Sequence, residues 1–163
     1  MKAKIIKNFI SKEESEILTK QIKQNLNLFK KCDQCVGTVK KHNFKPIVYL
    51  LASKTKEISE IIGEKLLPSY CYTRIYKKDT ELTPHTDREA CEVTVTLHLS
   101  GDKPWKLDID GEKILLDVGD AAVYEGTKYT HSREGKYNGI EYINTFLHYV
   151  RLAGIHSDEY FEK

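Results

Sequence analysis

Short runs of β-forming residues, each ended by glycine or aspartate, fill the second half of this 163-residue chain and constrain its fold most. Turn signals such as Asp110-Gly111 and Asn138-Gly139 lie between the runs. Many short strands at this spacing are typical of a sandwich or barrel, and here they predict a jelly roll. The predicted strands are Tyr70–Lys77, Cys91–Leu99, Trp105–Ile109, Lys113–Leu116, Ala121–Tyr124 and Tyr142–Arg151.

The first half of the chain has helical periodicity instead. Ser11 precedes Glu14 by three residues, which is a capping-box signature for the start of a helix. Pro46 suits the first turn of a second helix, and Gly63 lies near its predicted end. The predicted elements of this half are a strand, a helix, a polar loop with room for one short strand, and a second helix: Ala3–Lys7, Ser11–Leu28, Lys30–Lys45 and Ile47–Leu66.

The length of the chain suits one domain with one core. The sequence predicts a mainly helical lead-in at 1–69, a jelly-roll core with the functional site at 70–151, and a short tail at 152–163. Two helices in front of the strands would pack on the outer face of one sheet. The predicted class is therefore α+β.

Composition and charge exclude several classes of protein. Hydrophobic residues make up 40% of the chain and charged residues 31%, which excludes a collagenous or broadly disordered chain. The 26 basic and 24 acidic residues give a net charge of +2, which argues against nucleic acid or an anionic membrane as a partner. Apolar runs such as Ile47–Ala52 are far shorter than the roughly 20 residues that span a bilayer. The first residues turn polar too soon for a signal peptide, so we expect a cytoplasmic protein.

The four cysteines do not form a recognisable metal or redox motif. Cys32 and Cys35 make one CxxC, while Cys71 and Cys91 stand apart. A zinc site would need a second pair with matching spacing, and a thioredoxin-like site would need a βαβ context. We expect reduced thiols, and the Cys32/Cys35 pair stays a weak redox or metal candidate.

Three residues stand out on chemical grounds: His85 and Asp87 in an HxD, and His131 further along the chain. Strand side chains repeat every second residue, so an HxD in an extended segment places imidazole and carboxylate on one side. A histidine from another strand can complete a 2-His-1-carboxylate triad, which is diagnostic of non-haem Fe(II) oxygenases. HxD alone also arises by chance, and the alternative is an exposed His85 and a solvated Asp87.

The context of these residues resembles a known family. The segments LLPSYCYTRIYKKDTELTPHTDREACEVTVTLHLSGDKPW, LDVGDAAVYEGTKYTHSREGKYNG and NTFLHYV contain the HxD, a VGDAAVY strand, the distal histidine and an FLHYV strand in order. The chain resembles the 2-oxoglutarate/Fe(II)-dependent dioxygenases, in their small prolyl-4-hydroxylase-like branch. The resemblance covers about Leu66 to Val150, and IIKNFISKEESEIL resembles the lead-in of that branch.

The resemblance implies a fold, a set of cofactors and an activity. The fold would be a double-stranded β-helix, a cupin-like squashed jelly roll with the metal at its open end. His85, Asp87 and His131 would be the catalytic residues and would bind Fe(II), with 2-oxoglutarate and O2 as cosubstrates and ascorbate as an auxiliary reductant. The implied reaction hydroxylates a C–H bond of a small-molecule or peptide substrate, with peptidyl proline or an amino acid favoured, and converts 2-oxoglutarate to succinate and CO2. The oligomeric state stays open.

The cosubstrate pocket departs from the family's pattern. The family usually places Lys or Arg about ten residues after the distal histidine, where this chain has Glu141 or Tyr142. Arg74 and Arg133 are therefore the candidate anchors for the far carboxylate of 2-oxoglutarate, since a guanidinium suits a carboxylate. We prefer Arg74, which lies two residues from Tyr76 and shares its face of a strand, whereas Arg133 follows the distal histidine.

Clean alternation along 92–99 predicts which face of one strand lines the site. Polar residues occupy every second position as far as His98, and apolar residues such as Leu97 fill the positions between them. We expect the polar face to line the cosubstrate pocket, with Tyr76 and His98 adding hydrogen bonds, and the apolar face to meet the helices. The alternative for His98 is a buried histidine without a role in binding.

Two other classes of function stay open at this point. A cupin-like metal protein could use the same three ligands without 2-oxoglutarate, and the missing Lys or Arg is the argument for it. A binding module without activity could keep the jelly roll alone. Nucleic-acid demethylases of the superfamily rank low, because their arginines on the final strand are absent from Tyr142–Val150.

Overall fold

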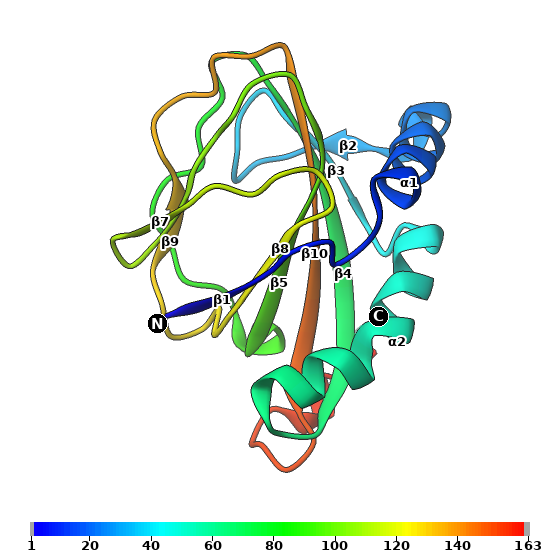
Figure 1. Cartoon of the computed structure of the whole chain (residues 1–163), viewed down its shortest axis with the longest axis vertical. Coiled ribbons are helices and arrows are strands. Elements are labelled where there is room, and N and C mark those ends of the chain that lie inside the picture. The colour runs from blue at the N-terminus through cyan, green and yellow to red at the C-terminus, as the bar shows by residue number, and fades with distance from the viewer. Residues whose placement is uncertain (1, 162–163) are drawn as a thin grey trace.

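Two antiparallel sheets face one another in the computed structural model, which describes residues 2–161 (Figure 1). The large sheet has the order β1-β8-β5-β10-β4-β3-β2 and the small sheet the order β7-β6-β9. The strands of the large sheet are β1 (Ala3–Ile6), β2 (Lys30–Lys31), β3 (Val39–His42), β4 (Leu66–Lys77), β5 (Val93–Gly101), β8 (Ala121–Tyr124) and β10 (Glu141–Arg151). Those of the small sheet are β6 (Leu107–Ile109), β7 (Glu112–Ile114) and β9 (His131–Arg133). The arrangement is the predicted jelly roll, or double-stranded β-helix, in an α+β chain.

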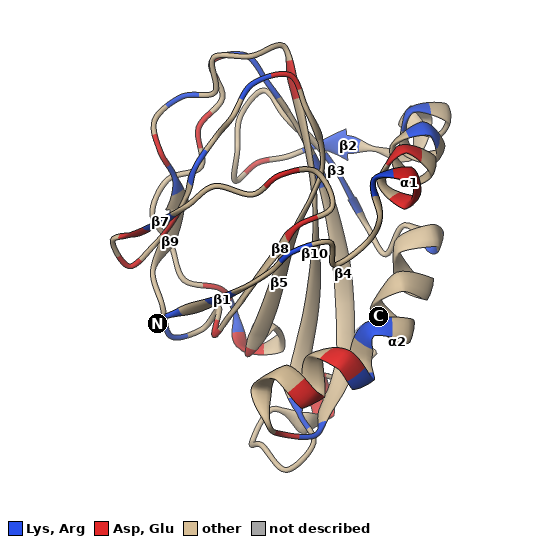
Figure 2. Cartoon of the chain, viewed as in Figure 1, with Lys and Arg blue, Asp and Glu red and all other residues tan. Residues whose placement is uncertain are grey.

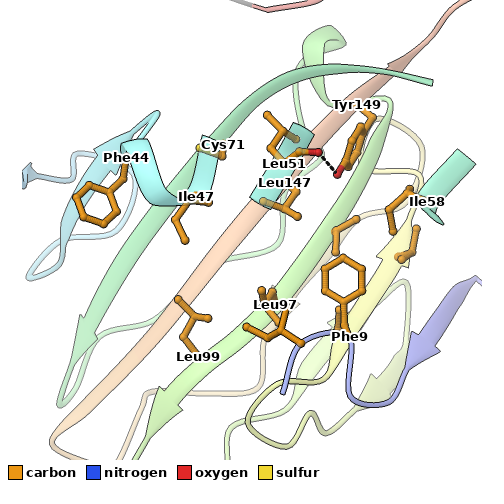
Figure 3. Packing of buried hydrophobic residues seen from close by; sticks show 14 of the residues in the cluster. Phe9, Phe44, Ile47, Leu51, Ile58, Cys71, Leu97, Leu99, Leu147 and Tyr149 are labelled. Carbon is orange, nitrogen blue, oxygen red and sulfur yellow. Dashed lines mark hydrogen bonds between the residues drawn. The ribbon is translucent and has the colours of Figure 1, made fainter. Parts of the chain in front are cut away.

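Two helices cover the outer face of the large sheet (Figure 1). Helix α1 (Lys12–Gln24) begins with the predicted capping box of Ser11 and Glu14, and α2 (Lys45–Ile62) has Pro46 in its first turn. The residues that α2 buries against the sheet include Ile47, Leu51 and Ile58 (Figure 3). Short 3-10 turns occupy Leu26–Leu28, Glu89–Cys91 and Ser157–Glu159. Within the described residues, no helix has both the length and the apolar character needed to cross a bilayer.

Side-chain alternation on the central strands separates the core from the space between the sheets. On β5, four apolar side chains belong to the core beneath the helices, while Thr94, Thr96 and His98 point to the opposite face. The alternation predicted for this strand is therefore confirmed. The four core residues are Val93, Val95, Leu97 and Leu99.

Both helices end earlier than predicted. Helix α2 ends at Ile62 because Gly63 adopts a left-handed conformation with φ of 79° and caps it. Leu66, predicted as the last helical residue, is the first residue of β4. Helix α1 ends at Gln24, and the 3-10 turn continues to Leu28. A glycine near the expected end of a helix is typically the first residue after the helix, and Gly63 follows this rule.

The polar segment 30–45 was predicted as a loop with at most one strand, but it forms the two strands β2 and β3 at the edge of the large sheet. Their residues are mostly lysines, so apolar alternation could not reveal them. Strand β9 was also missed, because three residues are too few to show a period. This strand carries His131 and Arg133.

Candidate metal centre

The imidazoles of His85 and His131 and the carboxylate of Asp87 converge between the two sheets. His85 Nε2 lies 3.8 Å and His131 Nε2 3.4 Å from Asp87 Oδ1. The three ligand atoms all lie within 4.8 Å of one another. The alternative of an exposed histidine and a solvated carboxylate therefore does not describe these residues.

Backbone pairing holds the three ligands in place. His85 and His131 form a β-bridge: the N–H of His85 donates to the carbonyl of His131 with an N···O distance of 3.1 Å, and the reverse hydrogen bond has an N···O distance of 2.8 Å. The N–H of Asp87 donates to the carbonyl of Gly126 at 2.9 Å. Because these hydrogen bonds join the HxD segment to Gly126 and to the first residue of β9, main-chain geometry fixes the ligands.

Each histidine presents its Nε2 atom to the centre. His85 Nδ1 lies 2.8 Å from the carbonyl of Thr83, and His131 Nδ1 lies 3.0 Å from that of Tyr129. A carbonyl can only accept, so Nδ1 carries the proton and Nε2 keeps its lone pair. At metal–ligand bonds of about 2.0–2.2 Å, facial ligand atoms lie about 3 Å apart. The donor set and its spacing therefore fit a divalent first-row metal ion.

The Asp87 carboxylate is held by hydrogen bonds and by close packing. Thr94 Oγ1 donates to Asp87 Oδ2 at 3.0 Å, which leaves Oδ1 facing the histidines. Burial by itself raises the pKa of Asp87, but His131, His148 and Thr94 outweigh burial and leave this pKa below its usual value. Burial is the main cause that lowers the pKa of His148 to about 4.

Arg133 lies deep in the same cavity. Its Nη1 donates to the carbonyl of Trp105 at 2.8 Å, and its Nη2 reaches the carboxamide oxygen of Asn144 at 2.9 Å in the amide orientation that satisfies both groups. The guanidinium packs on the rings of Trp105 and Tyr142 at 5.3 Å and 5.0 Å. Only 4% of Arg133 is exposed, and its three neighbours are buried as well.

Arg74 lines the cavity from β4 and lies nearer its mouth. Its Nη2 donates to Gln34 Oε1 at 2.6 Å and to the Tyr72 hydroxyl at 3.2 Å, and its Nη1 donates to the Tyr76 hydroxyl at 3.2 Å. Gln34 is exposed, whereas Arg74 itself is 3% exposed. Among the described residues, neither Arg74 nor Arg133 forms an ion pair with a carboxylate. Two buried guanidinium groups thus line the cavity, and neither is paired with a carboxylate of the described residues.

The other candidates from the sequence lie elsewhere. Tyr76 is fully buried behind Arg74, where its ring meets Trp105 at 5.0 Å. His98 stacks on Tyr142 at 4.3 Å, and its Nδ1 lies 3.0 Å from the carbonyl of Leu116. It lines a separate cleft, since Tyr142 stands between its ring and Arg133. The structure does not bring His98 to the metal cavity.

Glu141 occupies the position where the family's cation was expected, and it points away from the cavity. Its carboxylate pairs with Lys77 at 2.5 Å and Lys23 at 3.1 Å. The next two inward positions of β10 are Tyr142 and Asn144, and both contact Arg133. The guanidinium of Arg133, on β9, thereby lies beside the part of β10 from which a Lys or Arg was expected to reach the cavity.

Sequence reasoning missed several residues of the cavity. Phe146 on β10 follows the same alternation as Asn144, so the period-two alternation of that strand would have identified it. Gln34 and Gly126 gave no signal, because both reach the site from loops that the fold brings close. Gly126 has no room for a side chain: a Cβ there would lie 2.4 Å from Asp87 Oδ2.

No family model matches the sequence, and no curated protein matches it. Solved structures do match over nearly the whole chain. A prolyl-4-hydroxylase from Pseudomonas putida is 13% identical with a TM-score of 0.72, covering 92% of this chain and 92% of that chain. HygX from Streptomyces hygroscopicus, with nickel, 2-oxoglutarate and hygromycin B bound, is 11% identical with a TM-score of 0.72, covering 93% and 84%.

A third match is a prolyl hydroxylase from Trichoplax adhaerens in complex with a hypoxia inducible factor peptide fragment. It is 14% identical with a TM-score of 0.71, covering 97% of this chain and 86% of that chain. The second and third of these neighbours are complexes with a small molecule and with a peptide, respectively. The chain therefore has the double-stranded β-helix fold of the 2-oxoglutarate/Fe(II)-dependent oxygenases, including their prolyl-hydroxylase-like members.

Proposed function

We propose that the protein is an Fe(II)/2-oxoglutarate-dependent oxygenase that hydroxylates a C–H bond. The observation that carries the proposal is one cavity that combines the His85, Asp87 and His131 triad with two buried arginines, neither of which forms an ion pair with a described residue. A metal ion and a dicarboxylate together satisfy both features. The double-stranded β-helix fold supports this choice.

In this proposal the triad binds Fe(II) and Arg133 binds the far carboxylate of 2-oxoglutarate. Arg133 is two residues from His131 on β9, so both side chains point to the same face. Its partners are all buried, and its Nε has no hydrogen-bond partner. A guanidinium in such a dry position gains most from a carboxylate. Arg74, preferred from the sequence, is the second candidate, because exposed Gln34 shows it to be nearer the mouth.

The chain's own part in the reaction is to bind, orient and exclude water. Fe(II), 2-oxoglutarate and O2, when bound, supply an oxidation that hydroxylates the substrate and yields succinate and CO2, with ascorbate as an auxiliary reductant. Thr83 and Tyr129 hold the histidine tautomers, and Thr94 orients Asp87. Trp105 and Tyr142 keep the Arg133 end of the cavity dry. Peptidyl proline or an amino acid is the first substrate class to test.

The cupin-like alternative is not favoured. It depended on the missing Lys or Arg after the distal histidine, and two buried arginines in the cavity remove that argument. A binding module without a metal would leave the three converging ligands without a role.

The test is the dissociation constant of 2-oxoglutarate, measured by anaerobic calorimetry with and without Fe(II). We expect binding to require the metal, and Arg133→Gln to weaken it by about 3–5 kcal/mol while Fe(II) affinity changes little. Lys128→Gln is the matched control, because Lys128 is an exposed lysine near β9 whose ion pair with Glu125 lies at the surface. Binding of 2-oxoglutarate that is equally tight without metal would contradict the proposal.

A further inference from the structure

Arg74 is a buried cation in the cavity. Once Fe(II) and 2-oxoglutarate are bound as proposed, no anion is left to pair with it. The charges of Fe(II), the Asp87 carboxylate, the 2-oxoglutarate dianion and the Arg133 guanidinium cancel. Arg74 remains, 3% exposed and without a carboxylate among the described residues. A buried charge without a partner is costly, so a second anion is expected in the working complex.

The groups that accept hydrogen bonds from Arg74 are neutral. They are the hydroxyls of Tyr72 and Tyr76 and the carboxamide of Gln34, and the Nε of Arg74 has no partner. Gln34 comes from the exposed loop between β2 and β3. A neutral side chain on a flexible stem at the mouth of the cavity is a group that an incoming anion can displace.

Further positive charge lies along the edge of the sheet outside Arg74 (Figure 2). Lys40 on β3 pairs with Arg74 across the sheet and points to the same face, with its Nζ 5.8 Å from the Tyr72 ring. Lys30 pairs with Lys40 from β2. Neither lysine forms an ion pair within residues 2–161. The exposed Asp33 lies in the loop that joins β2 to β3. The edge therefore offers an attractive path for an anion.

We propose that Arg74 binds an anionic group of the primary substrate, a carboxylate or a phosphate, that enters over Lys40 and displaces Gln34. This inference rests on the proposed function and narrows its substrate. It favours a small molecule with a free acid group, such as an N-acylated amino acid, over an uncharged proline inside a peptide. Arg74 acts as a specificity-determining residue, and Arg133 serves the cosubstrate.

Matched probes that differ in charge test the proposal. The protein is loaded with Co(II), which stands in for Fe(II), and with saturating 2-oxoglutarate. Calorimetry then gives the dissociation constants of N-acetyl-L-proline, of its neutral amide and of phenyl phosphate. The first two differ by one charge at constant shape, and the third separates a phosphate source from a carboxylate source.

We expect at least one of the two anions to bind tenfold or more tightly than the amide. Arg74→Gln should weaken that binding at least tenfold and change 2-oxoglutarate affinity less than threefold. Lys40→Gln should weaken it severalfold, more at low salt than at high salt. Lys41→Gln is the matched control, because Lys41 is the next residue on β3 and pairs with Thr73 on the opposite face.

Gln34→Ala provides a test that does not alter the buried arginine. It removes the neutral partner of Arg74 and should tighten binding of the anion severalfold. It therefore decides the question if Arg74→Gln fails to fold, as judged by circular dichroism. Equal binding of the acid and the amide, or unchanged anion binding in Gln34→Ala and Arg74→Gln, overturns the inference.

The two proposals fail in different ways. If Arg74→Gln abolishes 2-oxoglutarate binding while Arg133→Gln preserves it, Arg74 is the cosubstrate anchor, and this inference fails while the oxygenase proposal survives. If the parent protein binds no 2-oxoglutarate in the presence of the metal, the oxygenase proposal fails, and this inference fails with it.

Discussion

Asp87 is held by neighbours that lie outside the HxD motif. Thr94 donates to one carboxylate oxygen, and the backbone N–H of Asp87 donates to Gly126. Gly126 also packs so closely that a Cβ would lie 2.4 Å from Asp87 Oδ2 and 2.5 Å from Thr94 Oγ1. Residues behind metal ligands typically change metal affinity by 10–100-fold when they are altered.

Gly126→Ala should therefore weaken Fe(II) binding by about 10–100-fold, because the new methyl group displaces the carboxylate. The metal dissociation constant, measured under anaerobic conditions, checks this. Thr127→Ala changes the adjacent exposed residue and should bind Fe(II) as the parent does. Parent-like affinity in Gly126→Ala would show that the Asp87 carboxylate is not confined as described.

The sequence predicted the three ligand candidates, because the HxD motif and a later histidine in a β-rich segment can be recognised from the sequence alone. The structure brings their side chains together. It could not predict Gly126 or Gln34, since their roles depend on contacts between loops. His98 followed the predicted alternation of β5, yet it lies outside the cavity. Alternation gives the face of a side chain, and the position along the strand relative to Tyr142 decides which cleft it lines.

A turn before β8 ties the N-terminal segment to the jelly roll. Asp120 is 3% exposed, and its carboxylate accepts from Lys7 Nζ at 2.6 Å and from the Asn8 N–H at 3.0 Å. Gly119 has φ of +90°, and a Cβ there would lie 2.5 Å from the carbonyl of Ile10. Gly119-Asp120, predicted as a structural turn, thus holds the segment between β1 and α1 against the start of β8.

This turn should make stability depend on pH. Burial raises the pKa of Asp120, but Lys7 and the backbone N–H groups of Asn8 and Asp117 outweigh burial, so the net shift is downward. A lowered carboxyl pKa stabilises the fold above the unfolded value of about 3.9, and this stability is lost as pH falls through the folded value.

Asp120→Asn should therefore be about 1–3 kcal/mol less stable than the parent at pH 7, with the difference shrinking below about pH 4. Urea unfolding across this pH range measures the effect. Asp117→Asn, whose side chain is 76% exposed beside the same lysine, should be nearly neutral. A difference that is constant down to pH 2.5 would mean that the Asp120 charge does not stabilise this turn.

The secondary-structure elements that the sequence did not predict are mostly short strands at the edges of the sheets. The long strands β4, β5 and β10 have enough residues to show alternation, and all three were expected. Strands β2, β3 and β9 have two to four residues. They are strands because β3 pairs with β4, β2 pairs with β3, and β9 pairs with β6. Local sequence does not contain that information.

The two faces of the large sheet have different roles in the molecule: one packs in the apolar core, and the other lines the metal cavity. The outer face and α2 form the main apolar core, in which the Tyr149 hydroxyl donates to the carbonyl of Leu51 at 3.0 Å (Figure 3). The inner face and the small sheet enclose the metal cavity. The division predicts that stability and ligand binding can be altered separately.

Leu51→Ala should lower the free energy of unfolding by about 2–5 kcal/mol, because Leu51 is 2% exposed and its removal leaves a cavity in the core. Well below the midpoint of thermal unfolding, Fe(II) affinity should match that of the parent. Tyr49→Ala, on the exposed side of α2, should leave both quantities unchanged. A large loss of Fe(II) affinity in folded Leu51→Ala would show that the two faces are coupled.

The central claim is that the triad and a buried arginine together bind Fe(II) and 2-oxoglutarate. Anaerobic titration of the Fe(II)-loaded protein with 2-oxoglutarate, followed by visible absorbance, tests it most directly, because chelation by the keto acid produces a metal-to-ligand charge-transfer band. We expect a band that saturates at one 2-oxoglutarate per Fe(II), is lost in Asp87→Ala and persists in Asp117→Ala. Tight Fe(II) binding by the parent with no such band at any 2-oxoglutarate concentration would contradict the account.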